Sequence, residues 1–312
     1  MSAVEANELG KRYGSVIAVD DLTFAVEAGE VLGVLGPNGA GKTTAIRLLT
    51  TVLAPSRGSF AVAGVPSTRP AEIRAHIGVL PESPGYPERQ TGVEFLRYHA
   101  RLHGHGRASA SAVATSLLAE VGLSERGRSP IASYSRGMRQ RLGIARTLVN
   151  EPVVVFLDEP TLGLDPAGQR HVLATIASIA RDRGAAVLLS THLLAEVEET
   201  CSRVLILNRG RAVAEGTVAE IARRASAPRT ARLRVPAEHA RHAAAVLRDA
   251  PGVRQVVLPD TQPGALVVTL DGDGPAMNAG LRALADADIP LLSFELEGAR
   301  LSDAFIAMTE AA

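Results

Sequence analysis

Residues 36–43 read Gly-Pro-Asn-Gly-Ala-Gly-Lys-Thr, and this stretch decides the fold of the chain. It matches the phosphate-binding pattern G-x-x-x-x-G-K-[ST] at every fixed position. The apolar run Val31–Leu35 before it predicts a buried strand, and the spacing of Ile46, Leu49 and Leu53 after it predicts a helix. Glycines let backbone N–H groups turn towards an anion, and the first turn of a helix adds partial positive charge. A strand, a phosphate-binding loop and a helix in this order predict an α/β fold.

The side chains of this loop predict which groups contact a nucleoside triphosphate. Lys42 would neutralise the β- and γ-phosphates, and the Thr43 hydroxyl would hold Mg²⁺. The further residues that we expect at the nucleotide are Asn38, Gly39, Gly41 and Thr44. The alternative, a glycine-rich turn that happens to carry Lys-Thr, leaves the flanking strand and helix unexplained.

A second apolar run, Val153–Leu157, predicts a buried strand that ends in Asp158 and Glu159. The carboxyl ends of parallel strands are where such folds bind ligands. We expect Asp158 to hold Mg²⁺ through water and Glu159 to polarise the attacking water. Two solvated acids after a core strand are a common alternative, but the phosphate-binding loop favours the metal site.

The remaining pattern alternates strands with helices, which predicts a parallel sheet with antiparallel strands at its edges. The predicted strands lie at 77–80 and 186–190, the predicted helices at 135–149, 170–181 and 194–201, and a hairpin at 205–214. The polar, proline-containing stretch 222–230 predicts a linker after a first domain of residues 1–221. Residues 231–312 predict the order β-α-β-β-α-β, a small α+β accessory domain.

Length and composition limit the classes of protein that fit. The chain has 312 residues, and its 33 basic residues balance its 33 acidic ones, so we expect no nucleic-acid partner. No apolar run approaches the ~18 residues that a spanning helix needs. The single cysteine, Cys201, fits a reducing cytosol. We therefore expect a chain that is soluble by itself and meets a membrane only through a partner.

Residues 134–141 read Tyr-Ser-Arg-Gly-Met-Arg-Gln-Arg at the start of a predicted amphipathic helix. The Ser135 hydroxyl and the N–H groups near Gly137 can bind an anion there. Taken alone, the segment could be only a serine-capped helix. Its place about twenty residues before the acid pair resembles the signature motif of ABC transporter ATP-binding subunits, in its Y-S-x-G-M-x-Q-R form.

Three further markers carry the same resemblance. Leu162–Pro166 resembles the D-loop of these subunits. His192, preceded by Ser-Thr after a predicted strand, matches their switch histidine. Tyr13 matches the aromatic residue that stacks on adenine. The resemblance covers residues from about 3 to 220.

The resemblance implies a fold and a working assembly. The fold is the ABC nucleotide-binding domain: a RecA-like core with a mixed sheet, and a helical subdomain at about 91–134. Two subunits sandwich two ATP–Mg²⁺, so that Ser135 and Gly137 of one bind the γ-phosphate held by Lys42 of the other. Glu159 and His192 are the implied catalytic residues. The homodimer drives a separate transmembrane permease, present as two copies or a fused pair, from the cytoplasmic face of the cell membrane.

The sequence departs from the family pattern at three positions. Glu82 stands where the family usually has a glutamine that contacts Mg²⁺ and the attacking water, and a nearby Mg²⁺ would keep this carboxylate ionised. Arg136 replaces a glycine of the signature, and Leu162 replaces a small residue before the D-loop. These changes resemble the daunorubicin-resistance branch of the ABC-2 exporters, as does the terminal stretch 301–305. The branch implies efflux of a drug, antibiotic or lipid. Which molecule is carried depends on the permease, because the cargo path lies there.

Two other functions are open to a chain of this kind. ABC ATPases that act on ribosomes or DNA carry tandem nucleotide sites or a long coiled coil, whereas this chain has one phosphate-binding loop and no extended heptads. Importer subunits more often keep the standard signature and glutamine. The sequence therefore favours an exporter.

Overall fold

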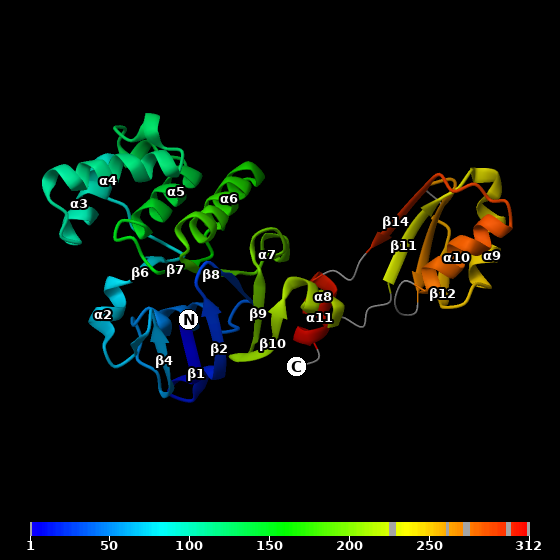
Figure 1. Ribbon diagram of the computed structural model, residues 1–312, viewed down its shortest axis with the longest axis horizontal. Helices are drawn as coiled ribbons and strands as arrows, with labels where there is room; N and C mark the ends of the chain where they lie inside the picture. Colours follow the sequence, from blue (N-terminus) through cyan, green and yellow to red (C-terminus); the bar gives the residue numbers. More distant parts are fainter. Residues whose placement is uncertain (1, 225–228, 260–261, 271–274, 298–300, 311–312) are drawn as a thin grey trace. The chain divides into compact units, whose positions relative to one another are not determined.

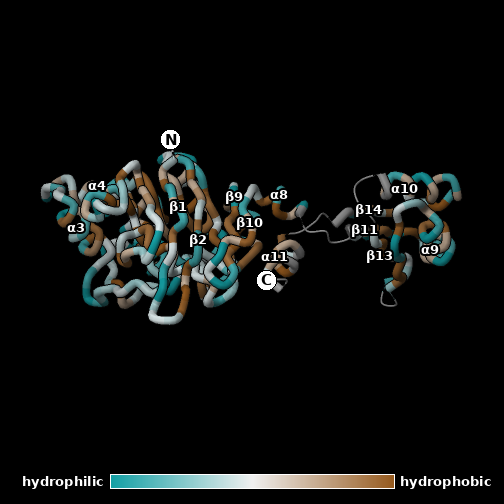
Figure 2. The backbone as a smooth tube through the Cα atoms, turned by 90° about the horizontal axis from the view of Figure 1, so that it is seen from below, coloured by the Kyte–Doolittle hydropathy of each residue, from teal (hydrophilic) through white to brown (hydrophobic). Residues whose placement is uncertain are grey.

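A computed structural model describes residues 2–224, 229–259, 262–270, 275–297 and 301–310. The chain divides into two compact units, residues 1–218 with 308–312, and residues 219–307. Figure 2 shows hydrophobic positions concentrated along the strands of both units. Among the described residues, no helix has the length and apolar character required to cross a bilayer.

An antiparallel sheet opens the first unit. Its strands are β1 (Ser2–Tyr13), β2 (Val16–Glu27), β4 (Arg57–Val62) and β5 (Val65–Pro66), in the order β2-β1-β4-β5. A turn after Tyr13 joins β1 to β2. The short strands β4 and β5 and the helix α2 (Pro70–Ala75) were not predicted.

A six-stranded sheet forms the centre of the first unit. It comprises β3 (Val31–Leu35), β6 (Ile77–Leu80), β7 (Val154–Asp158), β8 (Ala186–Thr191), β9 (Arg203–Asn208) and β10 (Arg211–Thr217), in the order β10-β9-β3-β8-β7-β6. All neighbours are parallel except β10, which is antiparallel to β9. Every residue of β3, β7 and β8 is buried, which explains their unbroken apolar runs. The predicted α/β fold with a mixed sheet is confirmed.

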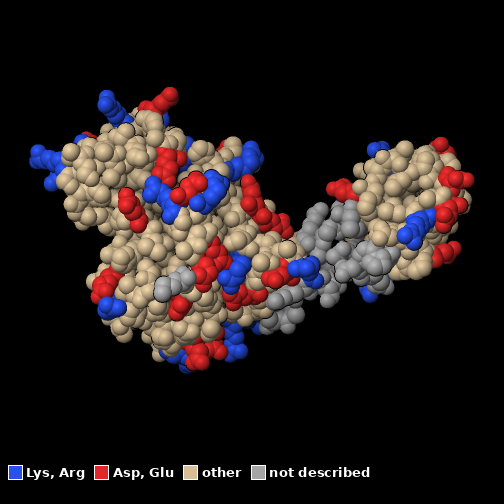
Figure 3. Space-filling model, viewed as in Figure 1, with Lys and Arg blue, Asp and Glu red and all other residues tan. Residues whose placement is uncertain are grey.

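Helices connect these strands and gather into a cluster at one end of the unit (Figure 1). The connecting helices are α1 (Lys42–Leu49), α6 (Pro166–Arg183) and α7 (Leu194–Thr200). The cluster comprises α3 (Gly92–Leu102), α4 (Arg107–Glu120) and α5 (Arg136–Thr147), with short 3₁₀ turns at Ser124–Arg126 and Ile131–Ser133. Thr91 and Glu94 form a capping box that begins α3. On the face drawn in Figure 3, acidic and basic side chains are interspersed over this unit.

The second unit has a sheet and a core of its own. After α8 (Val218–Arg224) come β11 (Arg229–Arg234), a 3₁₀ turn (Ala237–His239), α9 (Ala240–Arg248), β12 (Val253–Val257), β13 (Ala265–Leu270), α10 (Pro275–Asp286), β14 (Ser293–Glu297) and α11 (Leu301–Glu310). The strands are antiparallel in the order β12-β13-β11-β14, the arrangement of a split β-α-β fold. Ala231, Leu233 and Val235 face its apolar core, and Arg232 and Arg234 point to the other side.

The observed boundaries differ from the predicted linker and accessory domain in two places. The predicted linker 222–230 overlaps two regular elements: α8 continues to Arg224, and β11 begins at Arg229. Residues 225–228 lie outside the described part. Good helix formers and the buried Ile221 explain why the helix extends this far. The end of the chain groups with the first unit, where the Asn208 side-chain amide donates to the Thr309 carbonyl over 3.0 Å.

Candidate nucleotide site

The phosphate-binding loop joins the end of β3 to the start of α1. Gly41 precedes α1 with φ 105°, in the left-handed region, and a Cβ there would lie 2.5 Å from the Ala18 carbonyl oxygen. At Gly36, a Cβ would lie 2.5 Å from the Leu207 carbonyl oxygen. A side chain at either position would collide with a backbone carbonyl of a neighbouring strand, so only glycine fits at both fixed positions of the motif.

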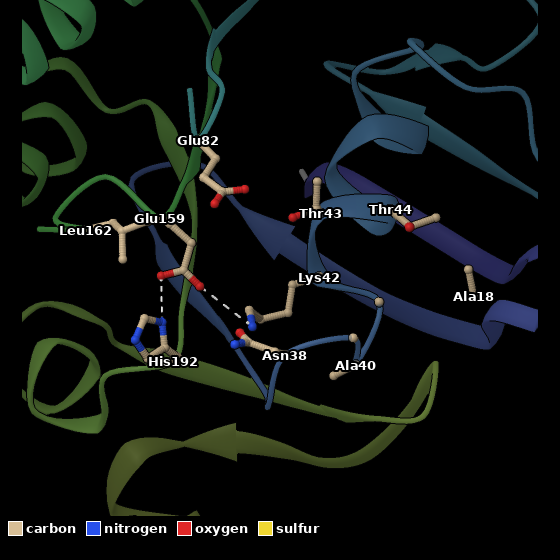
Figure 4. Close-up of a pocket in the computed structure, with 12 residues that line it drawn as sticks. Ala18, Asn38, Ala40, Lys42, Thr43, Thr44, Glu82, Glu159, Leu162 and His192 are labelled. Carbon is tan, nitrogen blue, oxygen red and sulfur yellow. Dashed lines mark hydrogen bonds and ion pairs between the residues drawn. The ribbon is translucent and has the colours of Figure 1, made fainter. Parts of the chain in front are cut away.

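A cavity of about 470 Å³ opens above this loop (Figure 4). It brings together most of the residues that the sequence predicts at the nucleotide. The lining comprises Ala18, Asn38, Gly39, Ala40, Gly41, Lys42, Thr43, Thr44, Glu82, Glu159, Leu162 and His192. Ala18 and Ala40 were not predicted. Ala40 occupies a variable position of the phosphate-binding loop, and Ala18, in β2, lines the cavity only because the fold places that strand beside the loop.

Lys42 is almost completely buried at the base of the cavity. Its Nζ donates to the carbonyl oxygens of Gly36 at 2.7 Å and Pro37 at 3.3 Å. It also lies 3.6 Å from Oε1 of Glu159. A buried ammonium group needs anionic or carbonyl partners, and a phosphate oxygen in this cavity would be a further one.

The Asp158 carboxylate, at the end of β7, lies between two hydroxyl groups. Its Oδ1 accepts from Thr43 Oγ1 at 3.2 Å and from Ser190 Oγ at 2.5 Å. Ser190 Oγ also accepts from the Glu159 backbone N–H at 3.1 Å. Thr43 and Asp158 thus present adjacent oxygen ligands, the kind that Mg²⁺ takes alongside phosphate oxygens and water. The role of Ser190 was not predicted, since the contact joins residues 32 positions apart.

Glu159 is held in one orientation from two sides. Its backbone has φ 50°, which is uncommon outside glycine, and its side chain is largely buried. Oε2 lies 2.9 Å from His192 Nδ1, while Oε1 faces Lys42. Figure 4 shows the carboxylate directed into the cavity between these two side chains. A carboxylate fixed beside the expected phosphate position can act as a general base towards water.

A hydrogen-bonded turn orients His192. Thr191 Oγ1 donates to Oε2 of the buried Glu196 at 2.7 Å and accepts from the Leu193 N–H at 3.0 Å. These bonds fix the backbone on both sides of the histidine. Glu196 was not predicted, because a glutamate in the first turn of α7 looks like an ordinary helix-start acid.

Glu82 enters the same cavity from the loop after β6. Figure 4 shows its carboxylate on the side of Thr43, across from His192. The Tyr86 hydroxyl in the same loop donates to the Arg139 carbonyl of α5 over 2.7 Å. Burial raises the pKa of Tyr86 to about 12, so the hydroxyl keeps the proton that it donates. This bond ties the Glu82 loop to the helix that carries the signature motif.

Ser135 and Gly137 line a different cavity of about 390 Å³. The Ser135 hydroxyl caps α5 by accepting from the Met138 N–H at 3.3 Å. The other lining residues are Arg136, Arg141, Gly163, Leu164, Asp165, Ala167, Gly168 and His171. The signature motif and the D-loop therefore form a shared surface, separate from the one that holds Lys42.

A contact with Gly163 accompanies Arg136, the residue that replaces a glycine of the signature motif. The Arg136 guanidinium lies so close that a Cβ on Gly163 would be 2.5 Å from its Cζ, and Gly163 has φ 70°. Arginine and glycine are thus complementary here. Asp165, two residues on, caps α6 by accepting from the Gly168 N–H at 3.2 Å.

Tyr13 is the one predicted nucleotide contact that neither cavity contains. It ends β1, is 45% exposed, and has Lys11 Nζ 5.4 Å from its ring centroid. The tight turn to β2 leaves the ring at the surface. Ala18, further along β2, lines the nucleotide cavity instead.

Comparison with known proteins agrees with this geometry. The ABC transporter family matches residues 19–162. The daunorubicin/doxorubicin resistance ATP-binding protein DrrA of Streptomyces peucetius is 37% identical over 98% of this chain and 92% of its own length. The Nod factor export ATP-binding protein I of Paraburkholderia xenovorans is 38% identical over 69% of this chain and 71% of its own.

A solved structure shows the same fold in the first unit. The ATP-binding cassette MJ0796, in a dimeric post-hydrolysis state with ADP and Pi, matches with a TM-score of 0.63 over 69% of this chain and 98% of that chain, at 20% identity. The family follows from the similarity to DrrA, which spans nearly the whole of both chains. The chain therefore belongs to the ABC transporter family, as an ATP-binding subunit with ATPase function.

Proposed function

We propose that this subunit binds ATP–Mg²⁺ in the Lys42 cavity and hydrolyses it to drive export through a separate membrane permease. One observation carries the proposal. The Glu159 carboxylate lies between His192 and the phosphate-loop lysine, in the cavity that also exposes Thr43. This is the arrangement that water activation beside a bound γ-phosphate requires.

The residues predicted from the sequence each have a part in this proposal. Lys42 and the loop N–H groups bind the phosphates, with Asn38, Gly39, Gly41 and Thr44 around them. Thr43, Asp158 and Glu82 hold Mg²⁺, directly or through water. The ion would neutralise charge that develops on the phosphate oxygens. Glu159 accepts a proton from the attacking water, and His192 orients that carboxylate. Tyr13 would reach adenine only if the β1–β2 turn moves.

The separate cavity at Ser135 supports a dimeric working form. Ser135 and Gly137 lie at the start of α5 and do not line the Lys42 cavity. A second copy can bring its Ser135 helix onto the phosphates, so that ATP joins the two subunits head to tail. The dimeric cassette with ADP and Pi, which shares this fold, is consistent with such pairing.

The proposed cargo class rests on the relatives. Their names describe daunorubicin and doxorubicin resistance and Nod factor export. We therefore assign this subunit to efflux of a drug, antibiotic or lipid-like molecule by a permease of the ABC-2 type. In this arrangement the subunit works at the cytoplasmic face of the cell membrane, and ATP occupancy is coupled to the permease state.

The substitution Lys42→Ala tests the nucleotide site. We expect ATP affinity to fall by about 10- to 100-fold, because charge-assisted hydrogen bonds contribute about 1.5–3 kcal/mol. Arg47→Ala, on the exposed face of the same helix, is the matched control and should bind ATP normally. Equal ATP titration curves for Lys42→Ala and wild type would contradict the proposed site.

A further inference from the structure

Strand β14 is a free edge with exposed apolar side chains. Among the residues that the structure describes, it is the last strand of the second unit's sheet and pairs with β11 alone (Figure 1). Leu291, Leu292 and Phe294 are 41%, 61% and 38% exposed. Edge strands are commonly protected by charged side chains, above all lysine, or by proline; β14 contains no lysine or proline, and its charged residues are Glu295 and Glu297. Such an edge favours pairing with another strand.

Two charged side chains lie beside this edge. Arg234 of β11 lies opposite Ser293, and Glu295 lies opposite Arg232, all on the sheet face away from the core. Within the described ranges, neither the Arg234 guanidinium nor the Glu295 carboxylate forms a hydrogen bond or ion pair. Within the described part of the sheet, Arg234 and Glu295 thus lie unpaired next to the edge, and Glu295 is two residues further along β14 than Ser293, the residue opposite Arg234.

We propose that β14 pairs with β14 of a second copy of this chain, antiparallel and centred on Phe294. A two-fold axis through this position sets Phe294 opposite the partner's Phe294 and Ser293 opposite the partner's Glu295. The two four-stranded sheets then form one eight-stranded sheet with their helices on the same face. Both rows of unpaired backbone groups become hydrogen-bonded.

This register resolves the unpaired charges. Across the joined sheet, Glu295 is followed by the partner's Ser293 and then by the partner's Arg234. Those two strand spacings amount to about 9.6 Å, which an arginine and a glutamate side chain span together. The contact occurs twice by symmetry. Centring the pair on Glu295 would instead set two like charges opposite each other, which is unfavourable.

The Phe294 rings meet on the other side of the same sheet. Phe294 lies opposite the buried Leu233 of β11, so its ring points to the helix-covered face. At the two-fold axis the rings cover each other's exposed edges, as aromatic cross-strand pairs do. The pairing needs no nucleotide, so it would hold two subunits together between ATP cycles. It does not depend on the proposed ATPase cycle and is tested separately from it.

Disulfide trapping in the full-length chain without nucleotide tests the register. Paired Cα atoms lie about 4.5–5.5 Å apart in an antiparallel ladder, within disulfide range, so oxidised Phe294→Cys should become mainly a covalent dimer. Leu292→Cys places the two sulfurs four residues out of register, and Val257→Cys lies on the opposite edge, so both should stay mainly monomeric. The native Cys201 is buried and does not compete. Phe294→Cys that crosslinks no more than Val257→Cys overturns the proposal.

A charge exchange tests the contacts without a cysteine. Glu295→Arg should raise the dissociation constant of the nucleotide-free dimer by about tenfold in light scattering, since two ion pairs become like-charge contacts. The double variant Arg234→Glu/Glu295→Arg should restore the wild-type value. Because ATP binds in the other unit, the folding of each variant is checked by circular dichroism and thermal unfolding of the full-length chain. A wild-type chain that stays monomeric without nucleotide, or a double variant as weak as the single, contradicts the pairing.

Discussion

Glu82 brings a carboxylate into a cavity that already contains Glu159 and lies beside Asp158. In the proposed site it faces Mg²⁺, and a carboxylate binds this hard cation more strongly than an amide does. In this proposal the charge at residue 82 would set how strongly the loop holds the metal, while Tyr86 connects the same loop to α5.

We predict that Glu82→Gln keeps ATP binding and lowers the apparent Mg²⁺ affinity of hydrolysis by about tenfold, the lower end of what outer-sphere partners contribute. Stimulation by the permease should change as well. Mg²⁺ titrations of ATPase rate, with and without permease, measure both effects. Glu88→Gln, exposed on the same loop, is the control. Identical Mg²⁺ curves for Glu82→Gln and wild type would show that the position is unimportant.

The residues at the site divide by how far the sequence could predict them. Lys42, Thr43, Asp158 and Glu159 could be predicted because a short motif fixes each relative to a strand end. Ser190 could not, because its bond to Asp158 depends on the pairing of β7 with β8. The bond of Glu196 to Thr191 and the exposed position of Tyr13 were not predicted for the same reason. A local sequence pattern does not show which residues the fold places next to a side chain.

At the scale of elements, one hydrogen bond joins the Glu82 loop to α5. Tyr86 packs against Phe95, with ring centroids 5.7 Å apart, while its hydroxyl reaches the Arg139 carbonyl. A Cβ at Gly143 would lie 2.5 Å from that hydroxyl, so α5 has a glycine where the tyrosine enters. A movement of the loop would therefore be passed to α5 and its Ser135 end through this contact.

We predict that Tyr86→Phe leaves ATP affinity unchanged and weakens the stimulation of hydrolysis by the permease. It should also lower the free energy of unfolding by about 0.5–1.5 kcal/mol, the value of one hydrogen bond. Chemical denaturation and coupled ATPase assays measure the two effects. Tyr98→Phe, on the exposed face of α3, is the control. Full stimulation of Tyr86→Phe would show that the bond does not transmit the movement.

Elements were predictable where burial leaves a strong periodic signal. The strands β3, β7 and β8 are buried on both faces and were found from their apolar runs. The short strands β4 and β5 lack such runs, and most of β4 before Phe60 is exposed. Residues 222–224, the last of α8, were interpreted as the start of a linker because the stretch 222–230 is polar and contains Pro228.

At the scale of the whole molecule, the nucleotide site and the second unit's sheet are separate in sequence. Every residue that lines the Lys42 cavity precedes residue 193. The second unit has its own apolar core, so we propose that it is an accessory domain that supports dimerisation or assembly with the permease.

We predict that a chain ending at Arg224 still binds ATP but loses the nucleotide-free dimer. Removal of Thr309 leaves Asn208 without its partner, which should cost about 1 kcal/mol of stability and no nucleotide contact. Nucleotide titration and light scattering on the shortened chain measure both. Lost ATP binding in a still-folded chain would show that the nucleotide site depends on the second unit, and unchanged dimerisation would remove the accessory role.

The central claim is that Glu159 activates water while the surrounding groups bind ATP. Glu159→Gln keeps the shape of the side chain beside His192 and Lys42 and removes its basicity. The most direct measurement is single-turnover hydrolysis of ATP by Glu159→Gln, with ATP binding and dimer mass recorded on the same sample. We predict normal ATP binding, hydrolysis about 10²- to 10⁴-fold slower, and accumulation of an ATP-bound dimer. Hydrolysis at near the wild-type rate would contradict the account.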